Sequence, residues 1–215
     1  MASILVVCTG NVCRSPMAEG FLLRLLGQRR LRAGIQVSSV GIAGLRGSGP
    51  MPESIAAAAE RGADISQHVA RRLDPRDVRK ADLVLTMTGG HRDRVLDMVP
   101  EAAAQTFTLK ELVRLLEALP SPASPGPPGD RLRARVRQAA DLRRTGFEGN
   151  PHDEDVADPM GMPQQTYDAV AWEIDEWCSR LVEGLFAEEG TAELEWAPTG
   201  RIPAAPPRPD ALPGA

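Results

Sequence analysis

The sequence is poor in cysteine, in aromatic residues and in long apolar runs. Its 3 cysteines, Cys8, Cys13 and Cys178, have neither the even number of a disulfide framework nor the spacing of a zinc site. No stretch approaches the roughly 18 apolar residues of a membrane-spanning helix, and the apolar start at residues 3–7 is too short for a signal peptide. These absences predict a cytoplasmic protein with no metal site, no cofactor and no membrane partner, whose thiols stay reduced.

The sequence also has no excess of positive charge. Lys and Arg number 25 against 29 Asp and Glu, which gives a net charge of -4 and no overall attraction to nucleic acid or an anionic membrane. Any recognition of an anion must therefore be local. With 215 residues, 42% of them hydrophobic, the chain is long enough for one globular domain with its own core.

Short apolar segments alternate with helical patterns along the first half of the chain. We expect strands at 3–7, 35–40, 81–87 and 105–108, and helices at 15–26, 53–61, 90–99 and 109–119, with a turn and a short helix within 64–79. Strands that alternate with helices predict an α/β fold in which a parallel sheet is covered by helices on both faces.

The second half of the chain begins with an insertion at about 120–145. It comprises a Pro-rich linker and then an Arg-rich helix at 131–144, which we interpret as a solvent-exposed helix packed lightly on the domain, with a docking surface as the alternative. A long helix at 166–186 is expected to bury its apolar residues, Trp172 and Cys178 among them. The sequence thus predicts a single domain over 1–187 and a disordered tail, rich in Pro, Ala and Glu, over 188–215.

The first strand runs into the loop Cys8-Thr9-Gly10-Asn11-Val12-Cys13-Arg14-Ser15-Pro16, the cradle loop, which opens a helix. A loop between a parallel strand and a helix N-terminus gathers backbone N–H groups and the positive end of the helix dipole, which favours an anion. The same dipoles and Arg14 favour the thiolate of Cys8, and Arg14 can grip two phosphate oxygens. Ser15 is expected to cap the helix and to donate a hydrogen bond to the Cys8 sulfur. The loop therefore predicts hydrolysis of a phosphate monoester by a cysteine nucleophile.

The cradle loop resembles the active-site loop of the low-molecular-weight protein tyrosine phosphatases. The similarity continues through Ser39 and Gly41, the segment 64–71 and Asp158-Pro159, and covers roughly residues 3–187 apart from the insertion. The resemblance implies a flavodoxin-like three-layer fold with a four-stranded parallel sheet of order 2-1-3-4. It also implies a reaction without metal that passes through a phosphocysteine, in which Thr9, Gly10 and Val12 help to bind the phosphate.

Asp158 matches the general acid of this family. One carboxyl group can protonate the departing oxygen and then, once ionised, activate the water that attacks the phosphocysteine. The neighbouring carboxylates Asp153, Glu154 and Asp155 compete for this role on composition alone, but their positions relative to Pro159 favour a merely acidic loop.

The resemblance also assigns supporting residues. Ser39 and His68 match positions that hydrogen-bond to Asn11 and stabilise its left-handed backbone, whereas His91 and His152 match no role. Cys13 matches a second cysteine that can form a reversible disulfide with the nucleophile; the alternative, a small buried side chain, is equally favoured.

The substrate is less well specified than the reaction. The family usually walls its substrate with aromatic rings, where this chain has Leu45 and Met160, so we expect a phosphotyrosine protein first and a small metabolite phosphate as the alternative. A thiol-coupled arsenate reductase would need further cysteines near residues 80–90, which are lacking. A non-catalytic binding module would need neither a nucleophile nor an acid.

Overall fold

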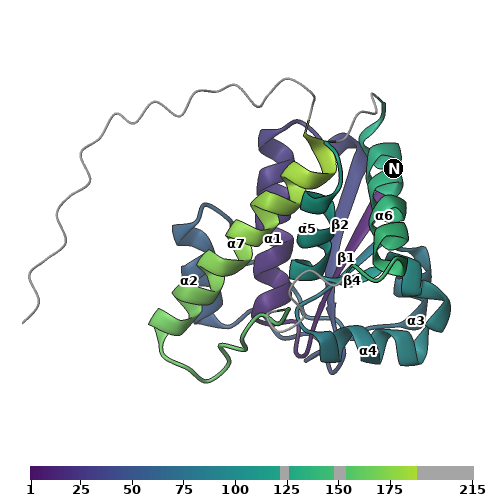
Figure 1. The fold of residues 1–215 in the computed structure, drawn as a ribbon. Helices are drawn as coiled ribbons and strands as arrows, with labels where there is room; N and C mark the ends of the chain where they lie inside the picture. The colour runs from purple at the N-terminus through teal and green to yellow at the C-terminus, as the bar shows by residue number, and fades with distance from the viewer. Residues whose placement is uncertain (122–125, 148–153, 188–215) are drawn as a thin grey trace, which may run out of the picture.

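One parallel sheet forms the centre of the computed structural model, which describes residues 1–121, 126–147 and 154–187 (Figure 1). Its strands are β1 (Ala2–Cys8), β2 (Ile35–Gly41), β3 (Leu83–Thr86) and β4 (Thr106–Thr108), in the order β2-β1-β3-β4. The expected α/β fold and strand order are confirmed. The expected tail and residues 122–125 of the linker lie outside the described residues.

The helices begin where capping residues and prolines allow. They are α1 (Arg14–Gln28), α2 (Pro52–Glu60), α3 (Pro75–Lys80), α4 (Gly89–Met98), α5 (Leu109–Ala118), α6 (Pro128–Arg144) and α7 (Gln164–Phe186), with 3-10 turns η1 (Arg32–Gly34) and η2 (Pro100–Gln105). Thr108 and Glu111 form a capping box at α5, and the Thr88 hydroxyl accepts the His91 N–H at the start of α4. None of the described helices is both long and apolar enough to cross a membrane.

The sheet buries both of its faces. Along β1, Ile4 and Val6 join the larger core, to which α1, α2, α5, α6 and α7 contribute, whereas Leu5 and Val7 join a smaller core with α3 and α4. This accounts for the uninterrupted apolar run of β1, because a central parallel strand has no solvent-facing side. In the sheet β1 lies between β2 and β3, so the chain moves to one side of β1 and later returns on its other side. The carboxyl end of a strand at such a change of direction is where α/β sheets bind ligands.

The Arg-rich helix α6 is not lightly packed, so that interpretation was wrong. Its stripe of Leu132, Val136 and Ala139 is buried as expected, but Arg131 and Arg135 are only 9% and 4% exposed. Arg135 donates hydrogen bonds to the carbonyls of Leu116, Pro120 and Gly184, at 3.3, 2.9 and 3.0 Å. The guanidinium group thus satisfies carbonyls near the ends of α5 and α7, while its stem packs between the helices.

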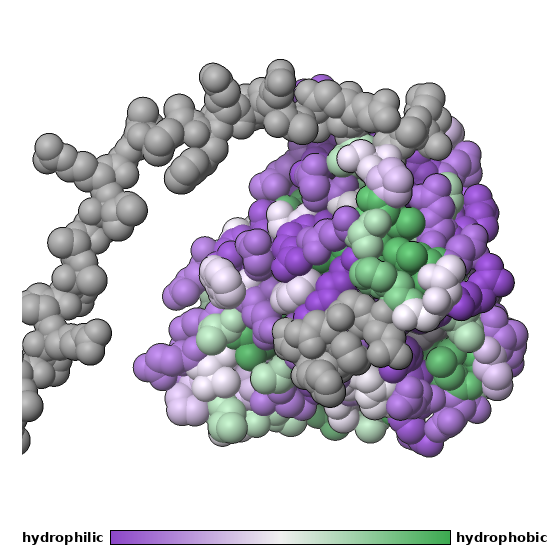
Figure 2. Space-filling model, viewed as in Figure 1, coloured by the Kyte–Doolittle hydropathy of each residue, from purple (hydrophilic) through white to green (hydrophobic). Residues whose placement is uncertain are grey.

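The prediction that α7 buries Trp172 was also wrong, because this side chain is 58% exposed. Side chains two positions apart on an α-helix differ by about 200° in direction, so Trp172 points away from the core that holds Ile174. Cys178 is fully buried as expected, and burial raises the pKa of its thiol. The face seen in Figure 2 is mostly hydrophilic, and its apolar areas include one continuous patch right of and above the centre.

Replacing Arg135 tests how α6 is held. Arg135→Met keeps a long stem and a good helix former but leaves three carbonyls without their donor, so we expect a loss of about 2–4 kcal/mol in the free energy of unfolding. Urea denaturation measures it, with Arg137→Met at an exposed position of α6 as the control, expected to change stability by less than about 0.5 kcal/mol. Equal losses in both variants would contradict this account.

Candidate active site

The backbone of the cradle loop is held from outside. The carbonyl oxygens of five consecutive residues, 8 to 12, all accept hydrogen bonds from other parts of the chain. Their donors are, in order, the backbone N–H groups of Ile42, Ala43 and Leu45, the His68 ring Nε2 and the Met51 N–H, at 2.9, 3.0, 3.0, 3.1 and 2.9 Å. In a trans peptide the carbonyl and the following N–H point in opposite directions, so the N–H groups of residues 9–13 face into the loop.

Two glycines allow the 41–45 turn to approach the loop this closely. A Cβ at Gly41 would lie 2.5 Å from the carbonyl oxygen of Thr9, and one at Gly44 would lie 2.2 Å from the carbonyl oxygen of Arg71. Side chains essentially never come this close to backbone, so glycine is required at both positions.

Asn11 lies at the centre of a polar network. Its φ of 59° is left-handed, which Asn tolerates better than most residues. Its side-chain Nδ2 donates to the hydroxyls of Ser15 and Ser39 at 2.9 and 2.8 Å, and its Oδ1 accepts the Arg71 N–H at 2.8 Å. The structure thus brings together Asn11, Ser39 and His68, and adds Glu19, whose carboxylate accepts the Ser39 hydroxyl at 2.6 Å.

Cys8 is buried at the base of the loop, with its Sγ 2.9 Å from the Ser15 hydroxyl and 3.3 Å from the Asn11 N. Since the Ser15 oxygen already accepts from Asn11, its hydrogen is free to point at the sulfur. Ser15 does not cap the helix as predicted: α1 begins at Arg14 with Cys13 as its N-cap. The hydroxyl is turned to Cys8 instead of to a backbone N–H.

Arg14 is only 4% exposed and is held on one edge. Its Nη1 donates to the carbonyl of Val156 at 3.0 Å, whereas Nη2 donates to Asp158 Oδ2 at 2.6 Å and to the Thr9 hydroxyl at 3.4 Å. The Nε is buried and has no hydrogen-bond partner among the described residues. Nε and Nη2 form the other edge of the planar group, a fork that matches two oxygens of a phosphate.

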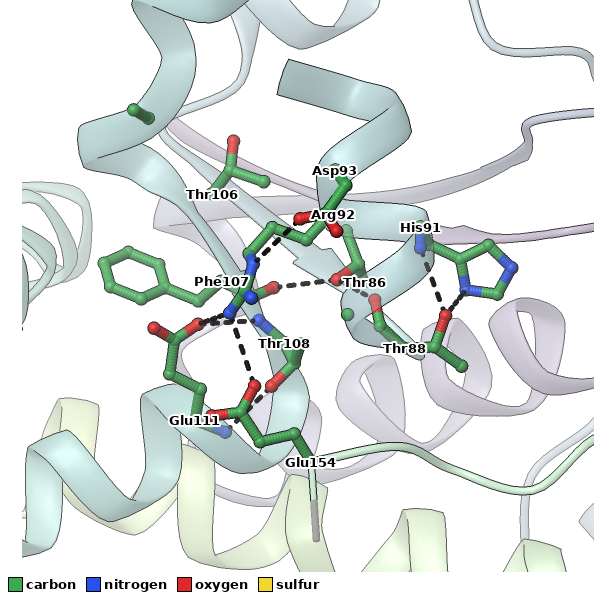
Figure 3. A network of polar contacts seen from close by, with 12 residues as sticks. Thr86, Thr88, His91, Arg92, Asp93, Thr106, Phe107, Thr108, Glu111 and Glu154 are labelled. Atoms are coloured by element: carbon green, nitrogen blue, oxygen red, sulfur yellow. Dashed lines mark hydrogen bonds and ion pairs between the residues drawn. The ribbon is translucent and has the colours of Figure 1, made fainter. Parts of the chain in front are cut away.

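The carboxylates that precede Asp158 are bound elsewhere. Asp155 Oδ1 accepts the N–H of Gly89, the first residue of α4, at 2.7 Å, where the helix dipole favours a negative charge. Arg92 bridges Glu154 and Glu111, at 3.3 and 3.1 Å, and burial raises the pKa of Glu154 (Figure 3).

Further contacts hold the segment that carries Asp158 at the carboxyl end of the sheet. The Val156 N–H donates to the Met87 carbonyl at 2.8 Å, next to β3, and Lys110 donates to the Asp155 carbonyl at 3.0 Å. Asp153 lies outside the described residues. Among the described carboxylates of this segment, Asp158 is the one paired with Arg14.

His91 occupies the site although the sequence assigned it no role. Its Nε2 is 2.9 Å from the Thr9 hydroxyl and its Nδ1 is 2.8 Å from the Thr88 hydroxyl, a pairing visible in Figure 3. Burial and the positive charge of Arg14 lower the pKa of His91 to about 4, so the ring is neutral near pH 7. Its position just after β3, next to the carboxyl end of β1, was the available signal.

Leu45 and Met160 flank the opening of the loop. A Cβ on Gly10 would lie 3.6 Å from Met160 Cε and 3.9 Å from Leu45 Cδ1, and 3.4 Å from Val12 Cγ2. Leu45 and Met160 are about half exposed. The structure therefore places both predicted wall residues beside the loop, with apolar atoms only.

Cys13, within the cradle loop, is 3% exposed. Burial raises the pKa of its thiol above the ordinary value. Both interpretations of Cys13, a disulfide partner and a small buried side chain, stay predictions. Within residues 1–121, 126–147 and 154–187, no group of three or more His, Cys, Asp or Glu side chains could hold a metal ion.

Comparisons with known proteins agree with the fold and with the strand order. The profile of the low molecular weight phosphotyrosine protein phosphatases matches residues 3–122. A protein-arginine-phosphatase of Geobacillus stearothermophilus is 31% identical over 86% of this chain and 97% of its own length. The low molecular weight protein-tyrosine-phosphatase Wzb of Escherichia coli K12 is 43% identical over 46% of this chain and 63% of its own.

The solved structures agree as well. The YwlE arginine phosphatase from Geobacillus stearothermophilus superposes with a TM-score of 0.62 at 31% identity, over 86% of this chain and 93% of that one. The chain belongs to the low molecular weight phosphotyrosine protein phosphatase family and is a cysteine-dependent phosphatase.

Proposed function

We propose that this phosphatase hydrolyses phosphorylated side chains of proteins, phosphotyrosine foremost, through a phosphocysteine formed on Cys8. The observation that carries the proposal is the orientation of the cradle loop. Five outward carbonyls leave the N–H groups of residues 9–13 directed at the space above the Cys8 thiol. A phosphate there would be surrounded by donors that also stabilise the thiolate.

Arg14 and Asp158 exchange partners when phosphate binds. The Nε and Nη2 groups of Arg14 would donate to two phosphate oxygens, which take the place of the Asp158 carboxylate now bound to Nη2. Asp158, released from Arg14, is then available as the proton donor of the first step. Binding thus frees Asp158 at the time that an acid is needed.

The first step forms the phosphocysteine. The Cys8 thiolate attacks phosphorus in line with the departing oxygen, the P–O ester bond breaks, and the Asp158 proton goes to that oxygen. In the second step the Asp158 carboxylate removes a proton from water, the resulting oxygen attacks phosphorus, and the P–S bond breaks. The Ser15 hydroxyl donates to the departing sulfur, so Cys8 leaves as a thiolate.

The opening of the site supports an uncharged ring as the substituent. Val12, Leu45 and Met160 place carbon atoms near Gly10, which suit an aryl group better than a cationic one. Phosphoarginine is the second candidate, because the arginine phosphatase matches this chain over 97% of its own length. Comparing kcat/KM on phosphotyrosine and phosphoarginine forms of one peptide decides between them.

Cys8→Ser tests the nucleophile. We expect the turnover of p-nitrophenyl phosphate to fall by about 10⁴-fold or more, because the hydroxyl is not ionised near neutral pH. Cys178→Ala, which changes a cysteine buried in α7, serves as the control and should keep its activity. Activity in Cys8→Ser, or inactivity of the wild type over a range of pH, would refute the proposed function.

Asp158→Asn tests the acid. Without a proton to give, the variant should lose about 10²- to 10⁴-fold in kcat on phenyl phosphate, a poor leaving group, but much less on p-nitrophenyl phosphate. Vanadate should still bind, since Arg14 remains in place. Equal losses on the two substrates would remove Asp158 from this role.

A double-mutant cycle tests whether His91 acts through Thr9. The neutral ring can accept the Thr9 hydroxyl hydrogen, which leaves the Thr9 oxygen to accept from Arg14. We expect His91→Phe and Thr9→Val each to raise the inhibition constant of vanadate by about 3- to 10-fold, and the double variant to be no worse than either. Additive losses at unchanged thermal stability would show that His91 acts by another route.

A further inference from the structure

Exposed apolar side chains border the opening of the cradle loop. Leu45, Val69, Met160 and Met162 are between 46% and 57% exposed. Leu45 and Met160 lie over Gly10, Met162 shares a turn with Met160, and Val69 precedes a residue that pairs with the 45–48 turn. Single exposed apolar residues are ordinary, but several around one opening indicate a surface that contacts a partner.

One side of this opening is strongly basic. The segments 41–49 and 67–73 carry Arg46, Arg71 and Arg72, all exposed, and contain no Asp or Glu. Backbone hydrogen bonds join the two segments, from Gly41 to Arg71 and from Gly47 to Ala70, so the segments that carry the three exposed arginines lie side by side. We name Leu45, Arg46, Val69, Arg71 and Arg72 the basic rim.

The arginines of the basic rim have no acidic partner among the described residues. In the parts of the chain that the structure describes, none of the three forms an ion pair, and Arg71 donates to the Ser39 carbonyl at 3.3 Å. The protein as a whole has a net charge of -4, so three positive charges here are a local reversal. The other side of the opening carries Asp158 on the segment of Met160. The charge of the opening is therefore asymmetric.

A small metabolite would use little of this surface. Its phosphate fills the cradle loop, and its body reaches no further than Leu45 and Met160. An extended peptide advances about 3.3 Å per residue, so residues two or three positions from a phosphorylated side chain would reach the arginines. Carboxylates at those positions would meet guanidinium groups at the edge of the site, and an adjacent apolar side chain would meet Leu45 and Val69.

We propose that the basic rim docks an acidic segment of a protein substrate, with an apolar residue next to the phosphorylated one. This rests on the proposed function and names its substrate class, a phosphoprotein with an acidic flank. The rim contributes to substrate binding and steering, whereas the chemistry stays with the cradle loop.

Matched phosphotyrosine peptides test the proposal on the full chain. Three peptides that differ only in flanking residues, Glu, Ala or Lys on the same side, are compared by kcat/KM. We expect the Glu peptide to exceed the Lys peptide by about 10-fold at low salt, mostly through KM, because three exposed charge contacts each contribute modestly. The ratio should approach one near about 1 M salt, where the screening length is about 3 Å.

Charge reversal locates the effect. Arg46→Glu and Arg72→Glu should each lower the Glu-to-Lys ratio about 3-fold or more, and the double variant should bring it to one or below. Arg137→Glu is the matched control, since this arginine of α6 is also exposed, and it should keep the wild-type ratio. Val69→Thr keeps the shape of the side chain and should lower the preference for Leu over Ser beside the phosphotyrosine about 2-fold.

The outcomes separate two failures. If the wild type hydrolyses p-nitrophenyl phosphate but treats the three peptides alike, or if Arg137→Glu changes the ratio as much as Arg46→Glu, the docking proposal is overturned and the proposed function stands. If p-nitrophenyl phosphate is not hydrolysed, the proposed function itself has failed. Light scattering that shows two copies associating through the rim, abolished by Arg72→Glu, would also overturn the docking of substrate.

Discussion

The site depends on one constraint, the outward direction of five successive carbonyl groups in the cradle loop. A peptide unit cannot turn its carbonyl out without turning the next N–H in, so the surroundings of the loop determine its interior. The outer partners come from the 41–45 turn, from the start of α2 and from His68. Glycine at 41 and 44 and the left-handed Asn11 are conditions for this arrangement, because they let neighbouring backbone approach and the chain turn.

The first turn of α4 links the two halves of the site. His91 contacts Thr9 of the cradle loop, while its neighbours Gly89 and Arg92 hold Asp155 and Glu154 on the segment that carries Asp158. Residues of one helical turn thus fix the cradle loop and the segment of the proposed acid against each other. The 2.6 Å contact between Arg14 and Asp158 is a result of this alignment.

The sequence predicts what depends on short-range pattern. Strand, loop and helix around Cys8 are encoded within some twenty neighbouring residues, and alternation of strands and helices indicates the parallel sheet. Asp158 was predicted through family resemblance, because an Asp-Pro pair by itself is a common turn signal. Residues whose role depends on distant partners were missed or misread. His91 gains its contact from Thr9, 82 positions away, and Arg135 is buried by the ends of other helices. Ser15 makes the predicted contact with Cys8 but does not cap α1.

In the ion pair between Arg14 and Asp158, the carboxylate of the protein competes with incoming anions for Arg14. A carboxylate tethered by a fastened segment acts at a high effective concentration, so any anion entering the loop must displace it. A singly charged anion offers Arg14 no more than Asp158 already does, whereas a phosphate dianion brings a second charge and further oxygens for the inward N–H groups. Asp158 thus favours the binding of doubly charged anions in the cradle loop over singly charged ones. This selects phosphate esters against the far more abundant monovalent anions of a cell.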